Sequence, residues 1–153
     1  GSGTTSPNET TNSLMREFVN SADPKQGGNN AMHGAVFGGH VDIVKYLTES
    51  CHADLALQND LGCDPLWLAA GYNRTDILEY LLTKLPNPKE SLLQTNKTGD
   101  TPMIAAASRG NKNAILILLE VSKALRMKDK LMAHSNRSMD TALGVAISSG
   151  HTS

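Results

Sequence analysis

Apolar residues recur at helical spacing in pairs of short segments along the chain. In each pair a short apolar stretch rich in small residues, such as residues 66–70 and 103–107, comes before a polar or glycine-containing break. A second stretch then carries paired apolar residues three to four positions apart, at residues 43–47, 77–82 and 115–119. This periodicity is typical of amphipathic helices that bury one face. The pattern predicts helix–turn–helix units.

The same unit is repeated along the sequence. Three copies read GNNAMHGAVFGGHVDIVKYL from Gly28, GCDPLWLAAGYNRTDILEYLL from Gly62 and GDTPMIAAASRGNKNAILILL from Gly99, and a partial copy reads MDTALGVAISSGH from Met139. Four equivalent alanines mark the copies: Ala35, Ala69, Ala106 and Ala146. They are 34, 37 and 40 residues apart, so the unit stays constant while its connections lengthen.

The start of the first helix in each unit has the residues of a helix cap. Pro65 and Pro102 stand at the first helical position, where a missing amide hydrogen costs nothing. The residues before this position can accept a hydrogen bond from a backbone amide, which predicts that they are N-caps. These predicted caps are Asn30, Asp64, Thr101 and Thr141.

Glycine and asparagine mark the predicted turns. Gly39 and Gly110 permit a left-handed backbone between the two helices of a unit. Between units, residues 59–62 (NDLG) and 96–99 (NKTG) predict tight hairpin turns. Met139 stands where the other copies have the turn glycine, so we expect that turn to lose regularity.

These motifs resemble the ankyrin-repeat family, whose pattern is roughly D-x-x-G-x-T-P-L-H-x-A-A-x-x-G-H-x-x-I-V-x-x-L-L, over residues 28–151. The resemblance implies an all-α solenoid of stacked helix-turn-helix units with short hairpin-like turns. It also implies a non-catalytic module for protein–protein interaction. Trp67, Ile104 and Gly144 replace the family histidine that is present as His33. We therefore expect Trp67 to lie in the core.

The repeat divides the chain into successive segments. Apolar residues near position 15 predict the outer helix of an earlier, partial repeat, which residues 6–9 (SPNE) would cap. Both ends carry incomplete repeats, which suggests that the chain is a piece of a longer protein. The predicted segments are 1–12 (tag remnant, from GSG, and N-terminal extension), 13–27 (partial repeat), 28–61 (repeat 1), 62–98 (repeat 2), 99–138 (repeat 3 with an enlarged basic loop) and 139–153 (partial repeat 4).

Charge is distributed unevenly although the net charge is only −1. Residues 41–80 hold two bases and seven acids, a balance of 2 − 7 = −5, whereas residues 81–137 hold ten bases and four acids, a balance of 10 − 4 = +6. The small net charge argues against general attraction to nucleic acid or anionic membranes. Two cysteines, and the lack of an apolar signal segment or of a run long enough to span a membrane, favour a reducing compartment, the cytoplasm or the nucleus. We also expect a monomer.

The sequence offers few candidates for catalysis or metal binding. Histidine and cysteine gather only in residues 33–63, and their spacing matches no usual zinc pattern. No glycine-rich phosphate loop, nucleophile elbow or paired-carboxylate motif is present. We therefore expect no enzyme activity, no metal and no cofactor. The residues weighed as ligands are His33, His40, Cys51, His52 and Cys63.

The resemblance places a partner-binding surface on the hairpin tips and the exposed ends of the inner helices. Aromatic and arginine side chains are favoured at such interfaces. The alternative for Phe37 and Tyr72 is packing between neighbouring repeats. The predicted partner-binding residues are Phe37, Asp60, Leu61, Cys63, Tyr72, Lys97, Thr98, Asp100 and Arg109.

A basic stretch before the fourth unit is a second candidate site. It could bind nucleic acid, a phosphoinositide or an acidic protein, or it could be a solvated face, and it lacks interleaved aromatic residues for base stacking. A further alternative is that the chain is a regulatory or targeting segment of a larger enzyme or channel. The basic residues are Lys123, Arg126, Lys128, Lys130 and Arg137.

Overall fold

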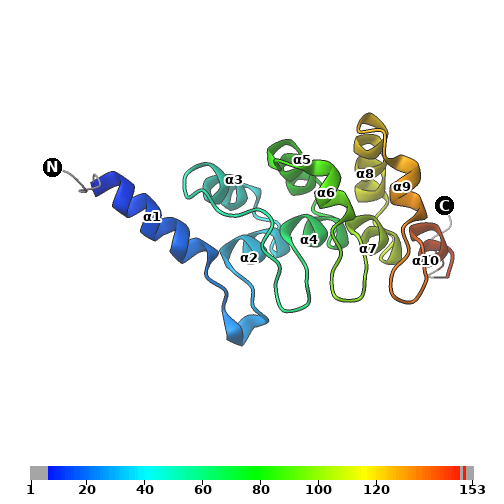
Figure 1. The fold of residues 1–153 in the computed structure, drawn as a ribbon, viewed down its shortest axis with the longest axis horizontal. Helices are drawn as coiled ribbons and strands as arrows, with labels where there is room; N and C mark the ends of the chain where they lie inside the picture. The colour runs from blue at the N-terminus through cyan, green and yellow to red at the C-terminus, as the bar shows by residue number, and fades with distance from the viewer. Residues whose placement is uncertain (1–6, 149, 151–153) are drawn as a thin grey trace.

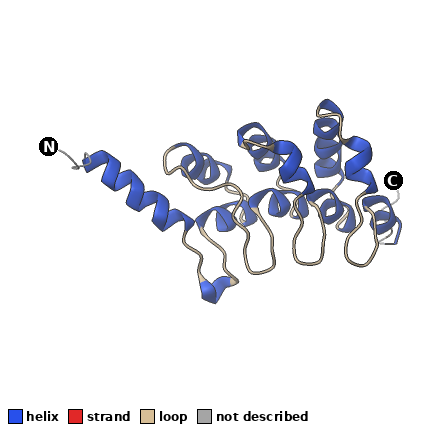
Figure 2. Ribbon diagram, viewed as in Figure 1, coloured by secondary structure: helices blue, strands red, loops and turns tan. Residues whose placement is uncertain are grey.

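A computed structural model describes residues 7–148 and residue 150 of the chain. This part folds into ten α-helices and one 3₁₀ turn joined by loops (Figure 2). The helices are α1 (Pro7–Asn20), α2 (Ala31–Phe37), α3 (Val41–Glu49), α4 (Pro65–Gly71), α5 (Thr75–Lys84), α6 (Pro88–Leu93), α7 (Pro102–Ser108), α8 (Lys112–Ala124), α9 (Lys128–Ala133) and α10 (Ala142–Ser148), and η1 is Pro24–Gln26. None of these helices combines the length and the hydropathy needed to cross a membrane.

The helices form two stacked rows with a row of hairpins along one edge (Figure 1). The inner row is α2, α4, α7 and α10, each packed on the next, and the outer row contains α3, α5 and α8. Each inner helix from α2 to α7 also packs against the outer helix that follows it. The predicted all-α solenoid is therefore confirmed.

The inner helices begin at the predicted caps. The side chains of Asn30, Asp64 and Thr101 each accept a hydrogen bond from the amide three residues later, at 3.0, 2.8 and 3.2 Å. Thr141 does the same for Gly144, at 3.2 Å. Each bond satisfies one of the amides that the first helical turn leaves without a partner. All four predicted caps are confirmed.

Every hairpin from the second onward is organised by one asparagine. The Asn59 side-chain oxygen accepts from the amides of Leu61 and Cys63, both at 3.0 Å. Asn96 and Asn136 accept in the same way from the amides two and four residues later. Met139 follows with a φ of 66° and preserves the turn, so the expected loss of regularity at this position is wrong.

Neighbouring hairpins are joined through their backbones. The Asp60 amide donates to the Gly27 carbonyl at 2.9 Å, the Lys97 amide to the Leu61 carbonyl at 3.0 Å, and the Arg137 amide to the Thr98 carbonyl at 3.0 Å. A Cβ on Gly62 would lie 2.8 Å from the Lys97 nitrogen. Glycine is needed there for this close approach and for a φ of 80°. The hairpins thus form a continuous row.

Small residues allow the inner helices to pack closely. Ala69 and Ala70 in α4 and Ala106 in α7 have no exposed surface. Leu78 and Leu118 from the outer row are equally buried. The apolar stripes predicted from the sequence form one continuous core. Trp67 is buried as well, which confirms its predicted place in the core.

The connections after the second and third units are partly helical, which the sequence pattern does not predict. Residues 85–95 contain α6, and the stretch expected as an enlarged basic loop contains α9 and the last turns of a longer α8. Leu92 in α6 and Leu131 in α9 are buried. Because a six-residue helix is unstable alone, this burial is what stabilises each one.

A long N-terminal helix precedes the first hairpin. The helix α1 begins at Pro7, so residues 7–12, expected as an extension, are helical; proline is tolerated in a first helical turn. Leu14 and Phe18 are exposed, and Val19 is buried. The predicted tag remnant at residues 1–3 and the Ser6 of the predicted capping box lie outside the described residues.

Candidate functional site

A groove of about 520 Å³ runs between the hairpin row and the inner helices. It brings together seven of the nine predicted partner-binding residues. These are Phe37, Leu61, Cys63, Tyr72, Lys97, Thr98 and Arg109. Three successive repeats contribute to this list, so the groove exists only in the stacked array.

Three side chains at the inner-helix ends form a cluster across the repeats. The rings of Phe37 and Tyr72 meet edge to face, with centroids 4.7 Å apart and an interplanar angle of 68°. The Arg109 guanidinium carbon lies 4.5 Å from the centroid of the Tyr72 ring. Edge-to-face rings and a cation above an aromatic face are both favourable. We call Phe37, Tyr72 and Arg109 the inner-end cluster.

The inner-end cluster contacts its neighbouring repeats and still faces solvent. Phe37 is 55% exposed, and Arg109 is also exposed. Phe37 therefore packs on the neighbouring repeat through Tyr72 and still keeps exposed surface, whereas Tyr72 is half-buried and packs against the core. An exposed aromatic side chain held by its neighbours has little entropy to lose when a partner binds.

Hydrogen bonds between repeats fix the backbone beneath the cluster. The Arg74 guanidinium donates to the Phe37 carbonyl from Nη2 at 2.7 Å and from Nε at 3.2 Å. The Asn111 side-chain amide donates to the carbonyls of Ala70 and Gly71 at 2.9 and 2.8 Å. Carbonyls at the ends of α2 and α4 are thus satisfied by the next repeat. The cluster is built on a rigid framework.

The groove floor includes His33 and Trp67, which occupy equivalent positions in successive repeats. The Asn30 amide donates to His33 Nδ1 at 3.0 Å, so Nε2 carries the proton and donates to the Leu57 carbonyl at 2.8 Å. Trp67 Nε1 donates to the Asp100 carbonyl at 3.2 Å. Each side chain therefore holds the connection to the next repeat, His33 at the residues before the hairpin turn and Trp67 at the residues after it.

Three predicted partner-binding residues have other positions or duties. Cys63 is only 3% exposed, so its side chain offers almost no surface. Asp100 is half-buried, and its carboxylate accepts from the Asn136 side chain at 2.8 Å and from Thr98 Oγ1 at 3.0 Å. Asp60 is exposed but lies outside the groove lining. The sequence predicts that these residues lie in or beside the hairpins, but it does not show which of their atoms are buried or form hydrogen bonds there.

The charged residues that line the groove, Lys97 and Arg109, are both positive. Neither forms an ion pair with a described residue. Exposed apolar surface lies beside these cations, since Leu61 is 68% exposed at a hairpin tip. The groove therefore offers a cationic, partly apolar surface. Residues of the lining that sequence reasoning missed include Gln26, Asn29, Asn59, Leu68 and Asn96.

Burial shifts the ionisation of three groups near the groove. It lowers the pKa of His33 below 6.5, which favours the neutral ring. It raises the pKa of the Cys63 thiol to about 11, so the reactive thiolate is disfavoured. It also raises the pKa of Asp64 from 3.8 to about 6, although the Trp67 amide stabilises the charged form. Burial in helix caps and turns explains the pKa shifts of these three groups without any catalytic role.

Within the described part of the chain, no three residues of the types His, Cys, Asp and Glu gather closely enough to hold a metal ion. His33 is committed to two backbone hydrogen bonds, and Cys51 and Cys63 are buried as free thiols. His40 and His52 are exposed, and the loop residue His52 has a φ of 53°. The histidines and cysteines of residues 33–63 therefore do not come together as one site in the structure.

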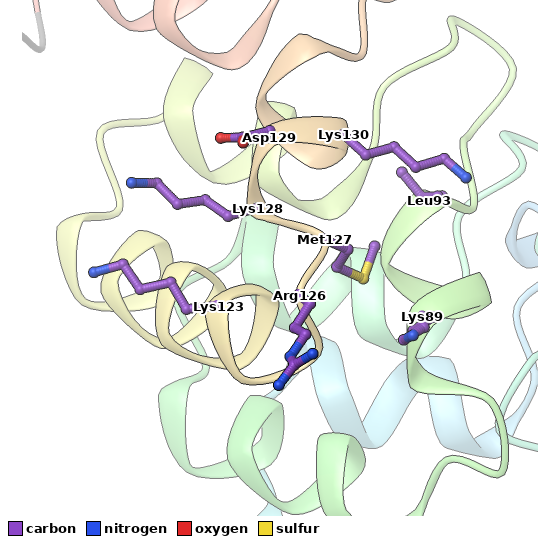
Figure 3. A pocket seen from close by; sticks show the side chains of 8 residues that line it. All are labelled: Lys89, Leu93, Lys123, Arg126, Met127, Lys128, Asp129 and Lys130. Carbon is purple, nitrogen blue, oxygen red and sulfur yellow. The ribbon is translucent and has the colours of Figure 1, made fainter.

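The predicted basic stretch lies at a second cavity, of about 730 Å³, between α6, the end of α8 and α9 (Figure 3). Lys123, Arg126, Lys128 and Lys130 line it. Arg137 does not, because it lies at the fourth hairpin. The lining also includes Lys89, which sequence reasoning missed because a helix from another repeat supplies it. The rest of the lining is Leu93, Met127 and Asp129.

Comparison with known proteins gives a finding that matches this architecture. The sequence fits the family model of ankyrin repeats, with three copies over residues 6–91, which is more than half of the chain. No curated protein sequence matches it significantly. Ankyrin repeats generally mediate protein–protein interaction, and domains built from them are typically non-catalytic. The chain belongs to the ankyrin-repeat family.

Proposed function

We propose that the chain is a non-catalytic recognition module that binds a segment of another protein in the groove along its hairpin row. The observation that carries this proposal is the inner-end cluster, in which Phe37 and Arg109 are exposed beside the half-buried Tyr72 and three repeats supply the side chains. Aromatic and arginine side chains of this kind often dominate binding energy at protein interfaces.

The groove chemistry indicates the kind of segment that it binds. Lys97 and Arg109 supply positive charge, and Phe37 and Leu61 supply exposed apolar surface. A partner segment with a carboxylate next to an apolar side chain complements both features. The guanidinium of Arg109 can pair with such a carboxylate through two parallel hydrogen bonds while its face rests on Tyr72.

We place this interaction in the cytoplasm or nucleus, with the module acting as a monomer. The free thiols of Cys51 and Cys63 are compatible with a reducing compartment. The groove is formed by repeats of a single chain, so the proposed binding needs no second copy.

The test compares capture of cellular proteins on the wild-type chain and on the Tyr72→Ala, Arg109→Ala double variant, with quantitative mass spectrometry. We expect a partner whose capture falls by about tenfold or more, which corresponds to about 1.4 kcal/mol. Circular dichroism and melting of both proteins check that the fold is retained.

A matched control distinguishes the groove from general surface effects. The Tyr46→Ala, Arg16→Ala double variant changes the same residue types at exposed positions on α3 and α1, away from the groove. We expect it to capture the partner as the wild type does. A partner lost equally from both double variants, or retained by both, contradicts the proposed site.

A further inference from the structure

We propose that the cavity between α6, α8 and α9 is a second binding site, for a compact ring molecule that carries two or more phosphate groups. This site is separate from the proposed protein-binding groove, since the two cavities share no lining residue. We call it the basic cavity. Its occupation and the groove's function can therefore be tested independently.

The lining of the basic cavity is strongly cationic. Five side chains are positive and one, Asp129, is negative, a balance of 5 − 1 = +4. These charged side chains come from three helices and from the link between two of them. The cavity volume of about 730 Å³ is in the usual range for small-molecule sites. The cations are Lys89, Lys123, Arg126, Lys128 and Lys130.

Most of these cations have no partner within the described part of the chain. Lys123 pairs with Glu120 at 3.7 Å, in an exposed contact that contributes little. The other four form no ion pair or side-chain hydrogen bond with any described residue. These cations are exposed, and an anionic ligand held among them would supply the counter-charges that the described part of the chain does not.

Two of the cations occupy positions that the local fold does not favour. Arg126 has a φ of 57°, a left-handed conformation in which glycine is the usual residue after a helix. Lys128 begins α9, where the positive end of the helix dipole disfavours a cation. The dipole of α8 favours a cation at Arg126, but nothing in the local structure favours a side chain in this backbone conformation or the charge of Lys128.

Buried neighbours fix the backbone that carries these cations. Met127 and Leu131 are buried on either side of the start of α9. The Met127 amide donates to the Ser122 carbonyl at 2.9 Å and closes the end of α8. In Figure 3, Lys123 and Lys128 extend in one direction and Lys130 in the other, where α6 carries Leu93 and Lys89, with Arg126 between them. Rotation of the lysine stems can turn their ammonium groups toward a ligand.

Charge and shape specify the ligand class. A phosphate group carries about −1.5 to −2 charges at neutral pH, so two or three of them match the balance of the lining. Leu93 and Met127 supply apolar surface for the carbon atoms of a ring. The lining contains no aromatic side chain for base stacking, which argues against single-stranded nucleic acid. A free phosphorylated polyol and the same headgroup on a lipid share this chemistry.

Isothermal titration calorimetry with inositol trisphosphate tests the site. We expect the Lys89→Gln, Lys130→Gln double variant to bind about tenfold more weakly than the wild type, because it removes cations from two helices of the cavity. The matched control is Lys25→Gln with Lys112→Gln, which removes the same charge from exposed positions outside the cavity. We expect the control to retain affinity within about twofold, since exposed distant charges are screened.

Co-sedimentation with vesicles identifies the source of the phosphate groups. One set contains phosphatidylinositol bisphosphate, and the other has the same surface charge from phosphatidylserine. Binding only to the first set, with competition by inositol trisphosphate, supports a lipid headgroup. Calorimetric binding without vesicle binding supports a free ligand. The proposal is overturned if the wild type shows no binding at about 1 mM trisphosphate, or if both double variants lose affinity equally.

Discussion

The guanidinium carbon of Arg109 lies 4.5 Å from the centroid of the Tyr72 ring and 5.8 Å from that of the Trp67 ring. One cation is therefore held beside two aromatic side chains of the preceding repeat. Its Nη1 also donates a long hydrogen bond, at 3.4 Å, to the Gly71 carbonyl. A planar guanidinium can stack and form hydrogen bonds together, which a lysine ammonium cannot.

We expect Arg109→Lys to weaken partner binding by about tenfold while leaving the net charge and the melting temperature unchanged. The reason is loss of the stacked, planar orientation, since the positive charge itself remains. Affinity for the captured partner is measured by calorimetry or interferometry, with Arg16→Lys on α1 as the control. Full binding by Arg109→Lys would show that charge alone is sufficient.

The buried cap Asp64 predicts a dependence of stability on pH. Its pKa is raised from 3.8 to about 6, a shift equivalent to about 3 kcal/mol. Because the folded state binds the proton more tightly, this contribution to stability is full below about pH 3.8 and is lost as pH rises through about 6. The ionised carboxylate therefore opposes folding at neutral pH.

We expect Asp64→Asn to stabilise the fold at pH 7 by about 1–2 kcal/mol, because asparagine keeps the cap acceptor without the charge. Asn30 already performs this role in the preceding repeat. Urea unfolding between pH 4 and pH 8 measures the change, with Asp64→Ala as a control that loses both the charge and the cap and is expected to be about 1 kcal/mol less stable than Asp64→Asn. Destabilisation by Asp64→Asn at every pH would contradict this account.

The neutral ring of His33 predicts a dependence of the opposite sign. Burial lowers its pKa below 6.5, so its contribution to stability is full above pH 6.5 and is lost as pH falls below that value. We expect nuclear magnetic resonance to show a ring protonated at Nε2 at pH 7 that titrates below 6.5. We also expect His33→Ala to cost about 1–3 kcal/mol, because it removes a buried side chain and leaves the half-buried Leu57 carbonyl without its donor. An ordinary titration near 6.5 would exclude the buried neutral ring.

We expect opposite effects on stability from adding a side chain at the turn position Gly62 and from removing the side chain of Met139 at the equivalent turn position. Gly62→Ala places a Cβ 2.8 Å from the Lys97 nitrogen at a φ of 80°, and we expect it to destabilise by about 1–2 kcal/mol. Met139 is 81% exposed and has a φ of 66°, so Met139→Gly relieves strain with little loss of burial. We expect a gain of up to about 1 kcal/mol.

Thermal melting measures both turn variants. Gly34→Ala in α2 is the control, because its Cβ would meet no atom within 4 Å and alanine favours helices. We expect this control to be neutral or stabilising. Loss of stability in Met139→Gly would mean that the methionine side chain has a structural role at the fourth hairpin.

Much of the fold was predictable because its signals are local. A cap such as Asp64 with Pro65 after it, or an asparagine three residues before Gly62, specifies the backbone within a few residues. Repetition strengthened each signal, since the same chemistry recurs in every unit. Even a substituted position can follow the pattern, as Trp67 does by lying in the core and donating a hydrogen bond to the connection with the next repeat.

The helices α6 and α9 were not predictable in this way. Six residues are too few to show an amphipathic period, and each helix depends on one leucine, Leu92 or Leu131, buried by other elements. The same limit applies to Lys89, which joins the basic cavity only because α6 lies beside the end of α8. Tertiary packing, which no short sequence window contains, decides all of these positions.

The candidate groove was predicted in outline but not atom by atom. Phe37, Tyr72 and Arg109 were expected at the inner-helix ends, and the structure brings them into contact. Asp100 and Cys63 were expected at the tips as well. Their atoms are taken up by a hydrogen bond to the next hairpin and by burial, respectively. The position of a residue within the repeat predicts where it lies in the fold. The contacts around its side chain determine whether that side chain is available to a partner.

The backbone hydrogen bonds between hairpins separate the part of the chain that can vary in length from the part that cannot. The repeats grow from 34 to 37 to 40 residues, yet the bonds that join successive tips remain at 2.9, 3.0 and 3.0 Å. The added residues lie in the connections that contain α6 and α9. Insertions there leave the pitch of the tip row unchanged. The array can therefore acquire new elements at its outer side while the spacing of its recognition residues stays constant.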